Sequence, residues 1–592
     1  MIWRRWVELR ALLGAVLGLL SFAAAQASSA PPPALQLQGL TDPILVRQIG
    51  LSVPVQRFAC DAPPLVFERY LTDATADARR ALQALGYFHA ELSPSLETQA
   101  GCTVPVLRVV PGERVRWAVA QIEVQDASGK SLRDQPFLRD FLQANTPAPD
   151  SPMDQGQYAR LRDGLLERAR GAGYLHAQWR RHVLRVDPAT NRATIELSLD
   201  AGRRARFGAI EIEQSLLSPE LASRLAGVQP GDHYTTANLV AINQNLMSPR
   251  YFSSVRVRPP LDQPTGDVVP VRVQAISGSP RSYEFKIGYG TDTGPRLGAV
   301  LHQWVVNPAG HQWRANLSLA QRQQTLSAAY TIPRLADPLN QRYELYSALD
   351  RENNLGITSL SMTNGAQWVR NFNRWNTALF TEYLLERSQF GDEPAMTNGF
   401  WLTGARVGWR ELNDPLFPTR GLAFNASLSG AAKPLLSSAS LLRARVQLAG
   451  MWPISDDWVW LGRTEVGGVL TDALTNLPKT LRFFAGGDQS VRGYGYQSLG
   501  PVDATGQPVG GRYVFTASTE LMHPVYGRDW WGAVFVDTGN AFDSLADFSL
   551  ATGAGVGLRW RSPVGVVRVD VAYPFDGSRR LPRLHLGIGV AF

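Results

Sequence analysis

The second half of the chain alternates apolar and polar residues in short segments, without a helical period. From Tyr283 to Phe592, segments of strand length are separated by Gly, Pro, Asn and Asp, which favour turns. We count about sixteen such segments, an even number, as in bacterial outer-membrane barrels. The pattern is clearest near the end, where 567–573 places valines on one face and Arg568 and Asp570 on the other.

The length and number of these segments favour a membrane barrel over a soluble β-sandwich. Each is about ten residues long, which is what a tilted strand needs to cross a bilayer. A sandwich also alternates, because one face of each strand meets its core, so a single segment decides nothing. The Gly-rich or polar inner faces, the C-terminal Phe and aromatic strand ends such as Trp530 and Trp531 favour the barrel. We therefore predict a transmembrane barrel of about 16 antiparallel strands over residues 280–592.

The N-terminus is predicted to be a signal peptide over residues 1–27. Three arginines among the first ten residues precede an apolar run at 11–25, which ends in an Ala-x-Ala cleavage site. This run is short for a membrane helix, and no other run of about 18 apolar residues follows it. We therefore expect an exported chain with no membrane-spanning helix.

The chain contains two cysteines, Cys60 and Cys102, which both fall in the first of the modules described next. An even number of cysteines in an exported chain favours a disulfide, and two buried thiols are the alternative. We predict the disulfide. The formal net charge of +8 comes from arginines spread along the chain without a nucleic-acid-binding motif, so we expect no nucleic acid partner.

The first half of the chain repeats one small unit three times, at 33–112, 113–201 and 202–277. A helix that runs into a Gly-Tyr pair recurs at 84–90 and 171–177, and a weaker version stands at 248–256. Each copy is predicted to have the order β-α-α-β-β, which resembles the α+β POTRA domain. No copy holds paired carboxylates, a metal-spaced Cys/His set or a phosphate-binding loop, so we expect no enzyme activity, no cofactor and no metal site.

A long Gly-rich connection at about 472–510 interrupts the alternation of the second half. Loops of this length are uncommon unless they are functional or disordered, and the aromatic and charged residues here argue against disorder. An arginine such as Arg492 needs a carboxylate when it is held away from water. Alternation places Glu520 and Asp537 on inner faces of the next two strands, which predicts an ion pair that holds the loop inside the barrel. The predicted loop motif and its lumenal partners are Val491, Arg492, Gly493 and Tyr494, and Asp537, Glu520, Phe535 and Gly539.

These motifs together resemble the BamA/TamA superfamily of outer-membrane assembly proteins. The resemblance rests on 491–494, on 534–539, on 555–559 and on Ser-Pro-Val-Gly at 562–565, and it covers essentially the whole mature chain. Three modules, with 481–488 and 530–537, look most like the TamA branch, since BamA usually has five POTRA domains. Val566 departs from the family, which often has Pro there.

The resemblance implies a barrel with a weak seam between its first strand and its last. It further implies a TamB-like partner anchored in the inner membrane and bound by the POTRA modules, with unfolded outer-membrane proteins such as autotransporters as substrates. Outer-membrane lipids are a further implied partner, because the pair is also linked to lipid delivery. The implied seam residues are Tyr283, Phe285, Ile287, Leu586, Gly587, Ile588 and Phe592.

Two other functions are compatible with parts of the pattern. A two-partner secretion pore of the same superfamily usually has two POTRA domains and a preceding plug helix, for which the leader leaves no room. A surface hydrolase fused to such a barrel would need a Gly-x-Ser-x-Gly elbow, and the sequence contains none. We therefore favour an assembly factor in the outer membrane of a Gram-negative bacterium, with its modules in the periplasm.

Overall fold

The computed structural model describes residues 34–60, 62–99, 101–259, 266–563, 565–576 and 581–588. The predicted signal peptide and the predicted seam residue Phe592 lie outside these residues. Internal contacts divide the chain into two compact units. The first ends at Arg206 and also takes in 233–236, and the second holds 207–232 and the chain from 237 onward. Within the described residues, no helix is both long and apolar enough to cross a membrane.

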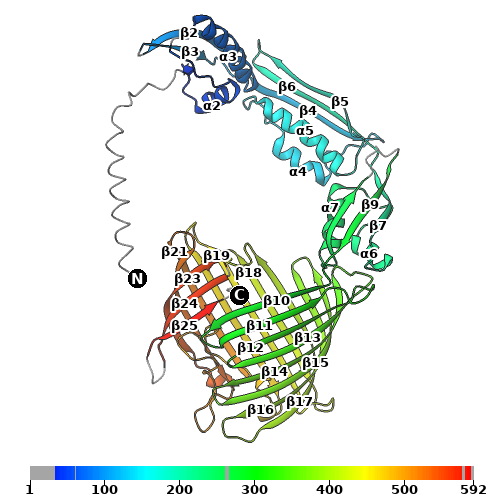
Figure 1. Cartoon of the computed structure of the whole chain (residues 1–592), viewed down its shortest axis with the longest axis vertical. Coiled ribbons are helices and arrows are strands. Elements are labelled where there is room, and N and C mark those ends of the chain that lie inside the picture. The colour runs from blue at the N-terminus through cyan, green and yellow to red at the C-terminus, as the bar shows by residue number, and fades with distance from the viewer. Residues whose placement is uncertain are drawn as a thin grey trace, which may run out of the picture. The chain divides into compact units, whose positions relative to one another are not determined.

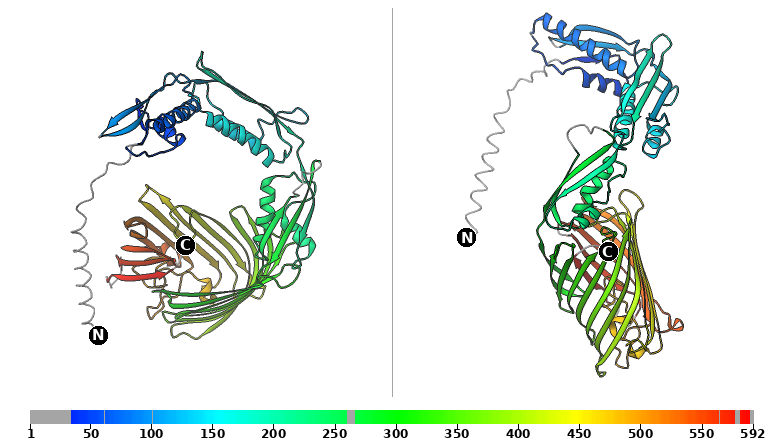
Figure 2. Two further views of the ribbon diagram at one scale, coloured as in Figure 1. Left: turned by 45° about the horizontal axis from the view of Figure 1, so that its top comes forward. Right: turned by 90° about the vertical axis from the view of Figure 1, so that its right-hand side faces the viewer.

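Each of the three modules follows the predicted order β-α-α-β-β, with its last strand at the centre of a three-stranded sheet (Figures 1 and 2). In the first two modules the opening strand pairs in parallel with the central strand, and the other edge strand pairs antiparallel. The elements are β1 (Gln36–Gln38), α2 (Pro43–Ser52), α3 (Pro64–Ala84), β2 (Glu91–Gln99) and β3 (Cys102–Val110); β4 (Arg116–Asp126), α4 (Pro136–Asn145), α5 (Gln155–Gly171), β5 (Gln178–Asp187) and β6 (Arg192–Gly202); and β7 (Arg206–Glu213), α6 (Pro219–Ala226), α7 (Thr236–Met247), β8 (Phe252–Arg258) and β9 (Val268–Ser277).

Capping residues and prolines define where several of these helices begin. The side chains of Asp42, Asp154 and Ser218 accept hydrogen bonds from the first-turn amides of α2, α5 and α6. Such caps satisfy backbone donors that have no partner within the helix. Proline occupies the first turn of α2, α3, α4 and α6, where its missing N–H is not needed.

The Gly-Tyr repeat marks a left-handed backbone residue at the end of the second helix of each module. Gly86 and Gly173 have φ angles of 92° and 101°. The third copy has Arg250 at this place, with φ of 61°. This explains why the third copy is weak in sequence, because the same turn is made there without glycine.

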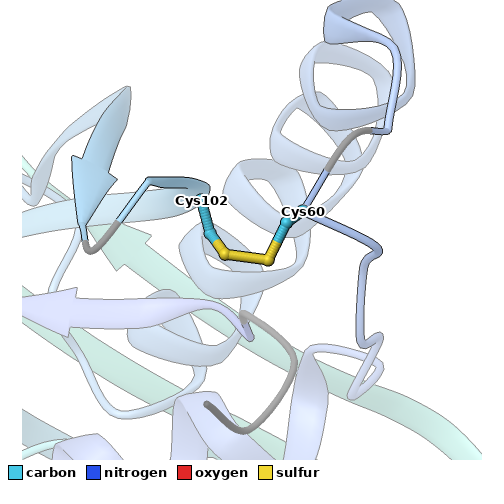
Figure 3. Close-up of a disulfide and its surroundings, with 2 residues drawn as sticks. All are labelled: Cys60 and Cys102. Atoms are coloured by element: carbon cyan, nitrogen blue, oxygen red, sulfur yellow. A yellow bond between two sulfur atoms is a disulfide. The ribbon is translucent and has the colours of Figure 1, made fainter. Parts of the chain in front are cut away.

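The predicted disulfide joins Cys60 to Cys102 in the first module (Figure 3). Cys60 precedes α3, and Cys102 opens β3. The bond therefore links the segment between the two helices to the central strand of the sheet.

Sixteen antiparallel strands close into a barrel, which confirms the predicted fold class (Figure 1). Each strand pairs with its neighbours in the chain, and β10 and β25 complete the circle. The strands are β10 (Arg281–Gly290), β11 (Gly294–Gln303), β12 (Gln312–Ala320), β13 (Gln323–Pro333), β14 (Gln341–Asn354), β15 (Ile357–Phe372), β16 (Trp375–Phe390), β17 (Met396–Leu412), β18 (Gly421–Ala431), β19 (Leu441–Pro453), β20 (Val459–Thr471), β21 (Tyr513–Tyr526), β22 (Trp530–Phe542), β23 (Ala551–Ser562), β24 (Gly565–Pro574) and β25 (Arg583–Ile588).

Several strands are longer than the ten residues predicted from the alternation. For example, β17 has 17 residues and β14 has 14. The added ends are rich in polar residues, for example Arg351 to Asn354. Alternation reports only the part of a strand that has one apolar face, so a polar extension beyond that band leaves no signal.

The third module packs against the turn between β11 and β12. The Tyr251 hydroxyl donates to the carbonyl oxygen of Gly310 at 2.6 Å, and the amide of Ser218 donates to that of Pro308 at 2.8 Å. Burial at this contact raises the pKa of Tyr251 to about 12. A side chain at Gly310 would meet Leu221 of α6, so glycine permits the close approach.

Candidate functional site

The loop between β20 and β21 turns back into the barrel and packs on its inner wall. Two short 3-10 turns, η1 (Leu474–Asn476) and η2 (Lys479–Leu481), lie near its start. Leu477, Leu481 and Phe483 of the loop join a buried apolar cluster with residues of β16, β17, β19, β20 and β21. The loop is therefore an ordered part of the barrel interior.

Arg492 forms the centre of a buried ion-pair network. Its Nε donates to Oδ2 of Asp537 at 2.6 Å, and its Nη2 donates to Oδ1 at 2.9 Å, so the pair is bidentate. The backbone amide of Arg492 donates to the same Oδ2 at 3.0 Å. The Arg492 side chain is 1% exposed and that of Asp537 is 0% exposed. Bidentate pairing restricts direction as well as distance, so it orients the loop.

Three further charged groups complete this network, which we call the arginine cluster: Arg492, Asp537, Glu520, Asp570 and Arg559. Nη1 of Arg492 lies 2.9 Å from Glu520 and 3.3 Å from Asp570. Arg559 bridges the same two carboxylates, with Nη2 2.8 Å from Glu520 and Nη1 in contact with Asp570. Two guanidinium groups thus face three carboxylates contributed by β21, β22 and β24.

Neighbouring side chains fix the geometry of the arginine cluster. The Ser518 hydroxyl donates to Oδ1 of Asp537 at 2.6 Å. The guanidinium of Arg492 stacks 3.4 Å from the centre of the Phe535 ring, which is a cation–π contact. Removing one partner from such a buried pair leaves an uncompensated charge and costs about 3–5 kcal/mol.

The residues beside Arg492 hold the loop backbone against the last strands. Val491 is fully buried. The amide of Gly493 donates to Nε2 of His585 on β25 at 3.0 Å. The Tyr494 hydroxyl lies 3.2 Å from the carbonyl oxygens of Thr552 and Asp576. A Cβ at Gly553 of β23 would collide with the carbonyl oxygen of Arg492, so the loop lies directly on that strand.

A second attachment lies near the start of the loop. Nζ of Lys479 lies 2.6 Å from Oε1 of Glu352 on β14, and the Lys479 side chain is 3% exposed. The amide nitrogen Nδ2 of Asn354, also on β14, donates to the carbonyl oxygen of Tyr496 at 3.2 Å. The loop is therefore tied to two separate parts of the wall.

The loop also contacts the turn between β10 and β11. The amide of Asp488 donates to Oδ2 of Asp292 at 2.6 Å. Gly487 makes this approach possible, because a Cβ there would lie 2.5 Å from the same oxygen. Burial and the neighbouring Asp488 carboxyl raise the pKa of Asp292 to about 7. The loop thus reaches the strand that opens the barrel.

The junction of β10 with β25 is the weakest in the barrel among the described residues. Gly290 and Gly587 are its one register pair, whereas β15 and β16 pair through all residues from Ile357 to Phe372. The amide of Thr291 adds a hydrogen bond to the carbonyl oxygen of Leu586 at 3.1 Å.

The outer face of β10 is unusually open at this junction. Tyr283, Phe285 and Ile287 are 63%, 80% and 86% exposed, against 53% for Leu345 on β14. The predicted seam residues of the last strand, Leu586, Gly587 and Ile588, belong to β25. The sparse pairing explains the exposure, since a fully paired neighbour strand would cover one side of each side chain.

The structure brings Arg492, Asp537, Glu520 and Phe535 together. A Cβ at Gly539, the fourth predicted partner of the loop, would meet the backbone of Phe515 and Thr516 on β21, so this glycine permits close strand packing. The prediction omitted Asp570, Arg559, Ser518 and His585. The alternation in β24 places Asp570 on the face opposite the valines. This pattern in the sequence was enough to propose Asp570 as a further partner of Arg492.

A cavity of about 1070 Å³ lies beside the loop inside the barrel. It extends from the junction at Gly290 and Gly587 to Glu465 on β20, and basic side chains outnumber acidic ones in its lining. Among the described residues, no group of three or more His, Cys, Asp or Glu side chains could hold a metal ion.

Comparisons with known proteins agree with this architecture. Residues 309–592 match the Omp85 superfamily domain, and residues 35–111 match the first POTRA domain of TamA. The outer membrane protein assembly factor BamA of Nitratidesulfovibrio vulgaris is 30% identical over 169 residues, which are 27% of this chain and 21% of that protein. BamA of Neisseria meningitidis serogroup B is 24% identical over 584 residues, which are 86% of this chain and 71% of that protein.

A solved structure shows the same fold. The crystal structure of Haemophilus ducreyi BamA lacking POTRA domains 1–3 superposes with a TM-score of 0.65 at 16% identity. The superposition covers 80% of this chain and 99% of that one. The barrel thus matches the Omp85 superfamily domain over 309–592, and the first module matches the first POTRA domain of TamA over 35–111.

Proposed function

We propose that this protein is a non-enzymatic assembly factor of the TamA type in the outer membrane of a Gram-negative bacterium, with its modules in the periplasm. It helps to insert or translocate outer-membrane proteins such as autotransporters. The TamA-type first module, the Omp85 barrel and the similarity to BamA proteins support this proposal.

The weak junction of β10 with β25 is the observation that carries the proposal. Backbone groups that are exposed to lipid need a hydrogen-bonding partner, because lipid offers none. Along 281–289, the described part of β25 offers β10 no register partner. An incoming strand that pairs with β10 satisfies its donors and acceptors, and strand addition of this kind is a known mode of recognition.

The modules supply the second half of the proposal. Each has an edge strand, β2, β5 or β8, on one side of its sheet. An extended segment of another chain can pair with such an edge. We propose that a TamB-like protein anchored in the inner membrane binds there, and that the pair also handles outer-membrane lipids.

Locking the junction tests the role of β10. Gly290 and Gly587 face each other, so the double variant Gly290→Cys/Gly587→Cys is expected to form a disulfide across the junction. Assembly of outer-membrane proteins, measured as the folded fraction of a newly made autotransporter in cells, should fall strongly and recover on reduction.

A cysteine pair at Ala366 and Thr381 is the control, because these residues face each other on β15 and β16, which are paired throughout. It should leave assembly unchanged. Full activity of the locked Gly290/Gly587 variant would refute an opening of this junction.

Site-specific photo-crosslinking in intact envelopes tests the partner. Glu91 and Ser95 on β2 are exposed positions for the probe. A very large product that contains an inner-membrane-anchored, β-rich protein would support the TamB-like partner. Crosslinks to small lipoproteins would instead indicate a BamA-type complex, and crosslinks to a single secreted polypeptide would indicate a secretion pore.

A further inference from the structure

Two lumenal arginines beside the junction, Arg296 on β11 and Arg568 on β24, have no partner within the described part of the chain. Neither makes a hydrogen bond or an ion pair with any described residue, and Nε of Arg568 is buried without an acceptor. An unsatisfied buried donor is unfavourable, and a guanidinium presents five donors in a fixed fork. Both side chains line the cavity next to the loop.

Other lumenal arginines form an ion pair with a carboxylate, which Arg296 and Arg568 do not. Arg406 lies 3.0 Å from Glu382, and Arg445 lies 2.8 Å from Glu465. The loop brings Asp488 into the same cavity, but within the described chain no ion pair joins it to Arg568. The two arginines beside the junction therefore lack the direct carboxylate contact that Arg406 and Arg445 make. Asp488, Asp570 and Glu520 attract the charge of Arg568 only at longer range, and Arg559 repels it.

Glycines on the two junction strands show where these arginines lie relative to the junction. A guanidinium nitrogen of Arg568 lies 3.4 Å from the Cβ position of Gly587, and one of Arg296 lies 4.0 Å from that of Gly290. Gly290 and Gly587 face each other across the junction, where opposed Cβ positions are about 5 Å apart. The two guanidinium groups therefore lie on either side of the pair that closes the barrel.

The surroundings fit an amphiphile with a charged head. The cavity on the inner side is large enough to admit a polar headgroup. On the outer side, Phe285 and Ile287 present exposed apolar side chains along β10. Only the thickness of one poorly paired strand separates the two environments.

We propose that Arg296 and Arg568 form a binding site for a phosphate-type anion on the lumenal side of the junction. Paired guanidinium groups bind phosphate oxygens through parallel N–H donors, which these two arginines have available. The phosphate belongs either to a free anion in the lumen or to the headgroup of a lipid at the junction. This proposal does not depend on assembly activity.

Calorimetric titration of the full chain in detergent micelles tests the site. The probes are inorganic phosphate, dihexanoylphosphatidylglycerol and the phosphate-free dihexanoylglycerol. The double variant R296Q/R568Q should lower the affinity for the phosphate-bearing probes about tenfold or more. The control is R387Q, which removes an exposed arginine of β16 far from the junction along the barrel wall and should change nothing.

The two sources of phosphate give different results. Binding of the lipid about tenfold more tightly than inorganic phosphate would assign the site to a headgroup, and equal binding of both would assign it to the free anion. Equal binding of dihexanoylglycerol, undiminished affinity of the double variant, or no binding of either phosphate probe would overturn the proposal. Heat-modifiable migration on gels checks that the variants are folded, and the single variants R296Q and R568Q replace the double if it is not.

Discussion

The two attachments of the inward loop differ in how many partners share each charge. In the middle of the loop, Arg492 contacts Asp537, Glu520 and Asp570, and Arg559 contacts two of the same carboxylates. Near the start of the loop, Lys479 has Glu352 as its ion-pair partner. A shared, bidentate network restricts direction, whereas a single ammonium group acts as a point charge on a flexible stem.

The surroundings of the two attachments differ as well. The arginine cluster is closed, because each of its carboxylates is buried and bonded. One of its strands, β24, is the neighbour of β25. Glu352, by contrast, lines the lumenal cavity, so water can reach it if Lys479 is removed. We conclude that the arginine cluster sets the position of the loop and that Lys479 adds a weaker, independent attachment.

The largest effect is expected from Asp537→Ala. The change leaves Arg492 buried with fewer acceptors, which should destabilise the docked loop by about 3–5 kcal/mol. Limited proteolysis of the loop in purified protein should become much faster. Asp529→Ala removes an exposed carboxylate from the turn between β21 and β22 and should have no effect. A protease-resistant loop in Asp537→Ala would contradict the role of the cluster.

Gly553→Ala should loosen the attachment at Arg492 without removing a charge. The added methyl group collides with the carbonyl oxygen of Arg492, and overpacking of this kind costs about 1–3 kcal/mol. Proteolysis again measures the effect. Gly430→Ala on β18 is the matched control, because its new methyl group makes only ordinary contacts, the nearest at 3.5 Å. Equal behaviour of the two variants would argue against contact between the loop and β23.

Lys479→Met should have a smaller effect, about 1–3 kcal/mol, because it leaves the Glu352 carboxylate without its ion-pair partner and keeps the length of the side chain. Double variants sharpen the comparison with the arginine cluster. Arg492→Ala with Asp537→Ala should be no worse than either change alone, since the two residues act as one unit. Arg492→Ala with Lys479→Met should be additive, and strong coupling between them would show that the attachments are not independent.

The smallest expected effect is a pH dependence at the contact between the loop and the first turn. Asp292 has a folded-state pKa of about 7, above its ordinary value, so the folded state binds this proton more tightly than the unfolded chain does. The contact therefore gains stability as the pH falls through 7 and loses it as the pH rises. Loop proteolysis should be slower at pH 6 than at pH 8, and Asp292→Asn should abolish that difference.

Some features of the fold and of the site follow from short stretches of sequence. The period of two indicates which residues of β22 face inward, so the amino-acid pattern alone is enough to propose Asp537 as a partner of Arg492. Alternation cannot give the end of β14 at Arg351 to Asn354, where both faces become polar. The pattern of a single strand also cannot show that Gly539 packs closely on Phe515 and Thr516 of β21, because that contact depends on the neighbouring strand.

The sequence by itself determined the class of the molecule: three repeated modules, a barrel of alternating strands, and a charged loop that needs inward carboxylates. These are local properties, since turn residues, helix caps and the period of side chains act over a few positions. Only the tertiary structure decided which inward groups meet. Asp570 and Arg559 join Arg492 through the register of neighbouring strands, and Lys479 meets Glu352 from a strand far away in the chain. The closing of the barrel likewise depends on how all sixteen strands align, so the single pair at Gly290 and Gly587 leaves no trace in either strand alone.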